Sequence, residues 1–142
     1  LAGAEAFREE GLPWWAGALD FDHYVDAKLA EKATKTHLWA IANDTFVGRI
    51  AVIHELTDAL RIEGGHIGYD TVPAFRGHGV ATQMLRQALP VARGLGLHVV
   101  RLTCDDTNAA SIRVIEKNGG QLIEIRSVQP GRPRKRLYDI PL

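Results

Sequence analysis

One short segment of the sequence combines an arginine with two closely spaced glycines, and such a segment is suited to binding an anion. Residues 76–81 read RGHGVA and follow an apolar run that stops at Pro73, which has no N–H for a strand ladder. Gly77 and Gly79 lack a Cβ, so a phosphate can approach their backbone closely. A helical pattern follows, and the first turn of a helix offers unpaired N–H groups and a partial positive charge. Arg76 can add a charge-assisted hydrogen bond, so the segment predicts a phosphate-binding loop.

Three kinds of phosphate-binding loop compete for this segment. A Walker loop ends in Gly-Lys-Ser/Thr, which is absent here. A dinucleotide fingerprint requires glycine three positions after Gly79, where Thr82 stands, and it expects an early strand–helix–strand unit. The acyl-coenzyme A pattern, Arg/Gln-x-x-Gly-x-Gly/Ala, matches residues 76–81 at each fixed position. The bland alternative is an ordinary strand-to-helix turn that uses glycine only for its geometry.

Alternating and helical patterns predict the elements that must position this loop. We expect strands over residues 37–41, 45–55, 65–72, 98–104, 121–127 and 135–140, with helices over 2–10, 20–32, 76–93 and 108–117. Gly48 is expected to break the second strand, and Pro90 is expected to kink the helix over 76–93. That helix connects two strands as a βαβ unit, which predicts that 65–72 and 98–104 run parallel. Residues 57–63 read as a polar connection with a short helical turn. Asn43 and Asp44 are typical of a turn, and residues 105–108 contain helix-cap residue types.

Length and composition describe one domain over residues 1–142, with a helical N-terminal part (1–36) and a core (37–142). The chain has 17 basic and 17 acidic residues, so no net field attracts nucleic acid or a membrane surface. No apolar run is long enough to span a bilayer, and no basic-then-apolar leader is present. The single cysteine, Cys104, favours a reducing compartment, and we expect a cytoplasmic protein without a metal.

Beyond the loop, two further motifs give the chain a family resemblance. Residues 108–111 read NAAS and residues 116–120 read EKNGG, while GGHIGY at 64–69 precedes the loop. With these motifs at this spacing, residues 38–138 resemble the GNAT superfamily of N-acetyltransferases, and bacterial members share the GGHIGY stretch. The resemblance implies an α/β (α+β) fold: a mixed, mostly antiparallel central sheet with flanking helices and one splayed parallel strand pair. Family members begin with a strand that no pattern in this sequence indicates, so we expect the first strand to be missing or truncated here.

The resemblance also implies a binding mode for acetyl-coenzyme A (acetyl-CoA). Pantetheine would pair with main-chain groups of the central strand, and the pyrophosphate would rest on the loop. Asn108 and Ser111, at the start of the next helix, match positions that contact the far side of the cofactor. The implied cofactor-binding residues are Tyr69, Asp70, Thr71, Val72, Arg76, Gly77, His78, Gly79, Val80, Ala81, Thr82, Asn108 and Ser111.

The groups that would move protons are less clearly marked. Many family members place a tyrosine seven residues after the asparagine to protonate the leaving thiolate, and here Ile115 stands there. Tyr138 on the last strand is the substitute we expect, with Cys104 a weaker one and water sufficient in principle. His66 and Glu63 are the candidates for the general base. A structural, hydrogen-bonded histidine is the competing interpretation of His66.

These observations predict an enzyme, an N-acetyltransferase that moves an acetyl group from acetyl-CoA to a primary amine of a small molecule or peptide by direct attack. A sensor that binds acyl-CoA without turnover is the alternative, and a different nucleotide binder is a third hypothesis. The expected partner is an amine acceptor that the sequence does not identify. Nucleic acid and membrane are not expected as partners, and a homodimer through the last strand is compatible with the sequence.

Overall fold

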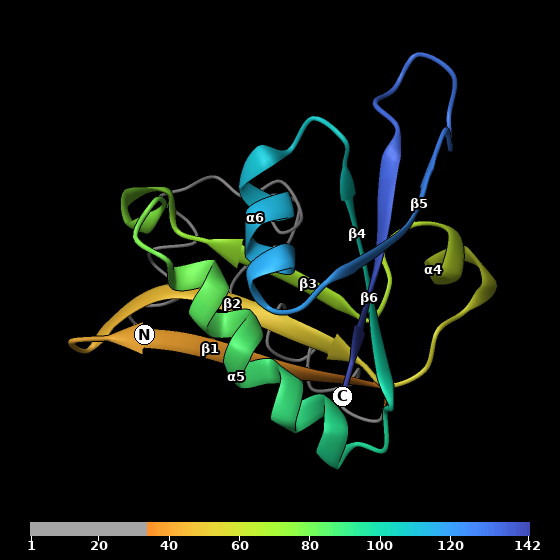
Figure 1. Cartoon of the computed structure of the whole chain (residues 1–142). Coiled ribbons are helices and arrows are strands. Elements are labelled where there is room, and N and C mark those ends of the chain that lie inside the picture. Colours follow the sequence, from red (N-terminus) through yellow and green to blue (C-terminus); the bar gives the residue numbers. More distant parts are fainter. Residues whose placement is uncertain (1–33) are drawn as a thin grey trace, which may run out of the picture.

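The computed structural model describes residues 34–142 of the 142-residue chain (Figure 1). Along the chain its elements are β1 (Lys35–Ala42), β2 (Thr45–Ile53), α4 (Asp58–Ile62), β3 (Ile67–Thr71), η1 (Pro73–Phe75), α5 (Val80–Gly94), β4 (Val99–Asp105), α6 (Ala109–Lys117), β5 (Gln121–Arg126) and β6 (Lys135–Pro141). The helices predicted over 2–10 and 20–32, and the question of a first strand, lie outside the described residues.

The strands form two three-stranded sheets, and every ladder within them is antiparallel. The first sheet has the order β1-β2-β3, and the second has the order β4-β6-β5. Asn43 and Asp44 turn β1 into β2 with positive φ angles of 48° and 62°, which confirms the turn predicted from their side-chain types. The predicted mixed, mostly antiparallel fold with flanking helices is therefore confirmed.

β3 begins beside the middle of β4, and the two strands run in different directions from that point (Figure 1). The His66 N–H donates to the Arg101 carbonyl at 2.7 Å, and Gly65 forms an isolated bridge with Leu102. The two strands are thus splayed, and the contact between them lies midway along β4. The bridge is of the antiparallel type, however, and no parallel ladder forms between them in residues 34–142. The Gly64–Gly65 turn explains this: both φ angles are positive, so the chain reverses locally where it touches β4.

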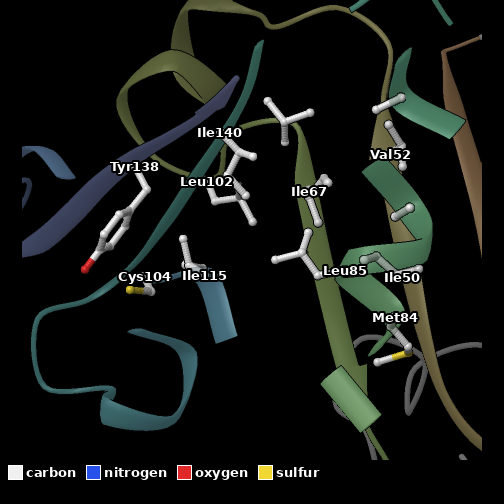
Figure 2. Packing of buried hydrophobic residues seen from close by; sticks show 13 residues of the cluster. Ile50, Val52, Ile67, Met84, Leu85, Leu102, Cys104, Ile115, Tyr138 and Ile140 are labelled. Carbon is white, nitrogen blue, oxygen red and sulfur yellow. The ribbon is translucent and has the colours of Figure 1, made fainter. Parts of the chain in front are cut away.

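The core lies between the two sheets and the two longer helices. Ile50 and Val52 of β2 and Ile67 of β3 meet Leu85 of α5, as Figure 2 shows. On the other side, the second sheet and α6 contribute a group of fully buried side chains: Val100, Leu102, Ile115, Tyr138 and Ile140. α5 buries Met84, Leu85, Ala88 and Ala92 on one face, which is the spacing of an amphipathic helix. The core thus fixes α5, and with it the loop that precedes the helix.

The observed elements differ from the predicted ones at two glycine-containing sites. β2 continues as one strand through Gly48, although its pairing with β1 shifts register there, from Ala40 opposite Gly48 to Ile41 opposite Phe46. A Cβ on Gly48 would lie only 2.7 Å from the Asp70 carbonyl oxygen on β3. Gly48 therefore permits close strand packing and does not end the strand. α5 begins at Val80 and not at Arg76, because Gly77 and Gly79 both have left-handed φ angles near 78°. The helix itself continues through Pro90 to Gly94.

Candidate functional site

The glycine loop presents an open backbone surface at the N-terminus of α5. Gly79 caps the helix with a φ of 79° and contributes no side-chain hydrogen bond, while the first recorded helical bond runs from Gln83 N–H to Gly79 O. The N–H groups of the first turn therefore lack the usual intrahelical acceptors. Apart from its chain neighbours, a Cβ placed on Gly77 or on Gly79 would meet no atom of residues 34–142 within 4 Å. No side chain in this part of the chain therefore crowds the backbone of these two glycines.

The charged side chains at the end of β3 include Arg76 and an ion pair between Asp70 and Arg49. The Arg76 Nε donates to the Thr71 carbonyl at 3.2 Å, which keeps the guanidinium against the end of β3. Asp70 is paired with Arg49, with 3.1 Å between Oδ2 and Nη2. His78 is exposed at the turn. The loop thus combines a helix N-terminus with a nearby arginine, as an anion site requires.

β3 is an edge strand, and its free edge faces the gap toward β4. The Val72 N–H donates to Val47 O on β2 at 2.9 Å, so the backbone groups of Val72 face the first sheet. Backbone groups alternate sides along a strand, so those of Asp70 also face β2, while those of Tyr69 and Thr71 face the gap. Of the four residues expected to hold pantetheine, Tyr69 and Thr71 are the two with suitably directed main-chain groups.

The start of α6 is tied to β3 by a side-chain hydrogen bond. Ser111 Oγ and Tyr69 Oη lie 2.5 Å apart, so these two predicted cofactor residues contact each other. Asn108 caps α6, because its Oδ1 accepts the Ser111 N–H at 3.1 Å. Asn118 at the other end of α6 donates to the Thr82 carbonyl in α5 at 3.3 Å. The structure thus brings the predicted contacts at 69, 82, 108 and 111 to neighbouring elements.

His66 lies at the junction of the two sheets. Its Nδ1 accepts the Arg101 N–H at 2.9 Å, which makes Nε2 the protonated nitrogen of the neutral ring. Burial lowers the pKa of His66 below its usual value, the cations Arg101 and Arg61 act in the same direction, and Asp139 opposes them. Asp139 is itself held by the Arg101 guanidinium at 2.8 and 2.9 Å. The ring is therefore neutral near pH 7 and its only lone pair is engaged.

The other proton-transfer candidates have their own partners. Glu63 follows α4 and forms an ion pair with Lys135, 2.9 Å between Oε1 and Nζ. Tyr138 is fully buried, and its hydroxyl donates to Glu116 Oε1 at 2.9 Å. Burial raises the pKa of Tyr138, so the phenol stays neutral at ordinary pH. No hydrogen bond or ion pair joins Glu63, His66 and Tyr138 to one another within residues 34–142.

The position where a helix tyrosine was expected is sealed in the core. Ile115 is 1% exposed, and it lies near Cys104 and Tyr138 in Figure 2. Cys104 is also buried, and burial raises the pKa of its thiol above the usual value. Residue 115 therefore packs the interior, and neither it nor Cys104 presents an acidic group to solvent.

Comparison with known proteins identifies the family. A model of the acetyltransferase (GNAT) domain matches residues 3–121. The chain belongs to the GNAT family. Searching curated proteins gives no match.

Three solved structures share the GNAT fold of this chain. The yncA protein of Salmonella typhimurium, solved with acetyl-CoA, has a TM-score of 0.67 at 21% identity, over 87% of this chain and 74% of that one. Spermidine N-acetyltransferase SpeG of Vibrio cholerae has a TM-score of 0.67 at 16% identity, over 84% and 72%. RimL, a ribosomal L7/L12 α-N-protein acetyltransferase solved with coenzyme A, has a TM-score of 0.64 at 16% identity, over 85% and 70%.

Sequence reasoning about this GNAT protein missed Arg101 and Asp139. Both belong to alternating strand patterns, where a charged residue normally means only an outward-facing position. Their importance depends on the register that sets Arg101 opposite Asp139 and next to His66. The only signal in the sequence was one charge of opposite sign on each of two predicted strands, and the pairing of those strands was not predicted.

Residues 34–142 hold no group of three or more His, Cys, Asp or Glu side chains arranged to bind a metal ion. Within the same part of the chain, no helix combines the length and apolarity needed to cross a membrane.

Proposed function

We propose that this GNAT protein transfers an acetyl group from acetyl-CoA to a primary amine of a small molecule or a peptide. One observation carries the proposal: the open glycine loop begins where the free edge of β3 ends. A ligand with a diphosphate at one end and an extended amide chain behind it fits this arrangement. Acetyl-CoA is such a ligand, because amides of the loop and of α5 can bind its diphosphate while β3 can pair with its pantetheine.

The chemistry of this proposal is attack of a neutral amine on the thioester carbonyl. Negative charge develops on the carbonyl oxygen, and a backbone N–H on the gap side of β3, at Tyr69 or Thr71, can donate to it. One such donor is typically worth a factor of about 10² to 10³ in rate. The carbon–sulfur bond then breaks, the acetyl group stays on nitrogen, and the thiolate takes up a proton.

Proton transfer can use several groups, and their assignments stay predictions. Glu63 is half-exposed and could accept a proton from the amine directly or through water, provided that its ion pair with Lys135 opens. Tyr138 would have to give up its bond to Glu116 before it could protonate a thiolate. Water can serve as the acid, since a thiolate is a good leaving group.

A non-catalytic acyl-CoA sensor is the second candidate. It is favoured by the burial of Ile115 and Tyr138, which leaves the thiolate without an obvious phenol. The acceptor, a homodimer and a cytoplasmic location remain predictions in either case. Structurally similar GNAT proteins are named for acting on spermidine or on a ribosomal protein, so both small-molecule and peptide amines are candidate acceptors.

Thiol release in the presence of an amine panel distinguishes the two candidates. We expect the protein to form coenzyme A steadily from acetyl-CoA with at least one polyamine, amino acid or peptide, and to bind acetyl-CoA in calorimetry. Because Cys104 is buried, the protein itself should add little to the thiol signal. Tight binding without release for every amine would favour the sensor. Competition by ATP but not by coenzyme A would contradict the loop assignment.

A further inference from the structure

His66 forms hydrogen bonds to both sheets. Its side chain accepts a backbone N–H that would normally bond to a backbone carbonyl. The His66 carbonyl accepts the Ile53 N–H of β2 at 2.7 Å. On the opposite side, the His66 N–H donates to the Arg101 carbonyl of β4 at 2.7 Å. An antiparallel partner of Arg101 would normally also offer a carbonyl to its N–H. That carbonyl is used on β2, and the imidazole Nδ1 takes its place at 2.9 Å.

This contact lies at the point from which β3 and β4 diverge. Gly65, the preceding residue, has no room for a side chain, because a Cβ would lie 2.3 Å from the Arg101 carbonyl oxygen. Gly64 N–H donates to Thr103 Oγ1 at 2.8 Å, one further link to β4. These contacts set the separation of the two strands, since no ladder holds them together farther along.

We propose that His66 is a positioning residue: by accepting the Arg101 N–H, its neutral imidazole sets the gap between β3 and β4 in which the acetyl thioester is held. The inference rests on the proposed function for the identity of the ligand, but the contact itself does not. It assigns His66 a role other than that of the general base, because a base needs a free lone pair and the neutral ring has only the one at Nδ1.

Protonation of the ring reverses this contact. A proton on Nδ1 turns the acceptor into a donor that faces the Arg101 N–H, so the hydrogen bond is lost. Among residues 34–142, the charged side chains that act on the ring are Arg101 on β4, Asp139 on β6 and Arg61 on α4. Asp139 is already bound to the Arg101 guanidinium, so a cationic ring would lie beside two cations with one shared carboxylate. Acidification should therefore open the junction.

Acetyl-CoA affinity measured against pH in matched variants tests the proposal. In the wild type we expect affinity to fall as pH drops below about 6.5, the ordinary histidine value, with an apparent pKa below it. His66→Asn places an amide oxygen at the same number of bonds from Cβ as Nδ1, and it should retain affinity at neutral pH without this acid dependence. His66→Leu removes the acceptor, so its affinity should be about tenfold weaker than that of the neutral wild type, the effect of one unsatisfied amide, and should not fall further in acid. His98→Asn, at an exposed histidine before β4, is the control, and its acetyl-CoA affinity should depend on pH as that of the wild type does.

Nitrogen NMR of the unliganded protein tests the contact independently of any ligand. Neutral His66 should be protonated at Nε2, and the Arg101 amide resonance should shift with the pH dependence of His66. If acetyl-CoA does not bind at all, the proposed function fails while this result still stands. A neutral ring protonated at Nδ1, or an acid dependence that persists in His66→Asn, would overturn the proposal. Loss of turnover in His66→Asn with normal acetyl-CoA affinity would assign His66 to catalysis instead.

Discussion

Gly79 joins the loop to α5 in a conformation that other residues rarely adopt. Its φ is 79°, and the place of a missing Cβ is open to solvent. A side chain there would cost backbone energy, about 1–2 kcal/mol for a residue forced into the left-handed region. It would also project toward the proposed diphosphate. Strain and ligand exclusion can be separated, because Gly96 at the far end of the same helix has a φ of 91° and equally open surroundings.

Replacing Gly79 with glutamate should therefore abolish acetyl-CoA binding. We expect Gly79→Glu to lower the affinity by about a hundredfold or more, because a like charge placed against the diphosphate costs several kcal/mol. Gly96→Glu should lose a similar amount of stability in urea unfolding and yet bind acetyl-CoA normally. Calorimetry on both variants makes the measurement. Unchanged affinity in Gly79→Glu would mean that the loop binds no diphosphate.

At the residue scale, the loop was readable from sequence and the junction was not. The requirement for glycine at 77 and 79 is local, because it comes from backbone conformation within four residues. The contact between His66 and Arg101 joins residues 35 positions apart and depends on how two sheets meet. No periodicity records that distance, so the sequence could offer only a base or a structural histidine as roles for His66.

α6 shows how one residue can serve an element and a site together. Asn108 stabilises the helix start through Oδ1, which accepts the Ser111 N–H. The side-chain amide nitrogen of Asn108 takes no part in the cap. The family resemblance assigns Asn108 to the cofactor, and the structure shows the cap, so both roles need to be measured separately.

Two substitutions at Asn108 should separate the two roles. Asn108→Ala should destabilise the protein by about 1 kcal/mol through loss of the cap, as measured by chemical unfolding. Asn108→Ser keeps a capping oxygen and removes the amide, so stability should be preserved. If the amide donates to acetyl-CoA, the serine variant should bind several-fold more weakly, by up to about tenfold for one neutral hydrogen bond. Equal affinity in the wild type and the serine variant would leave Asn108 with the cap alone.

Element boundaries could be predicted from the sequence where nearby side chains determine them. The turn at Asn43 and Asp44 and the cap at Asn108 were predicted from side-chain chemistry and are confirmed. Gly48 was misjudged as a strand break, because its reason is the approach of Asp70 from the neighbouring strand. The start of α5 was placed four residues early, since the helical pattern cannot reveal that two glycines take left-handed angles.

On the scale of the whole molecule, the two sheets are connected through a small joint, formed by the contacts of Gly64, Gly65 and His66 with β4. Within residues 34–142, three sets of hydrogen-bonded contacts link the first sheet to β4: those of His66, the contact of Gly64 with Thr103, and the Gly65 bridge. Core packing supports the joint from the side of α5, since Val52, Ile67 and Val100 share one cluster. A change at the joint should therefore affect global stability and not only the site.

Alanine substitutions at two neighbouring glycines should show this difference. Gly65→Ala forces a Cβ against backbone at 2.3 Å and requires a left-handed φ of 71°. We expect a loss of about 2–4 kcal/mol in the free energy of unfolding, from overpacking and backbone strain together. Gly68→Ala meets no atom within 4 Å and has no positive φ, so its stability should change by less than about 0.5 kcal/mol. Equal unfolding midpoints for the two variants would show that the joint tolerates displacement.

The short helix α4 has no fully buried residue, and it is held by the Thr57 cap, the Glu63–Lys135 pair, and the Leu60 carbonyl, which accepts the Gly65 N–H at 2.8 Å. Changes on the exposed face of this helix should therefore leave the core unaltered, whereas a change at Leu60 would reach the Gly64–Gly65 turn and, through it, the separation of β3 and β4.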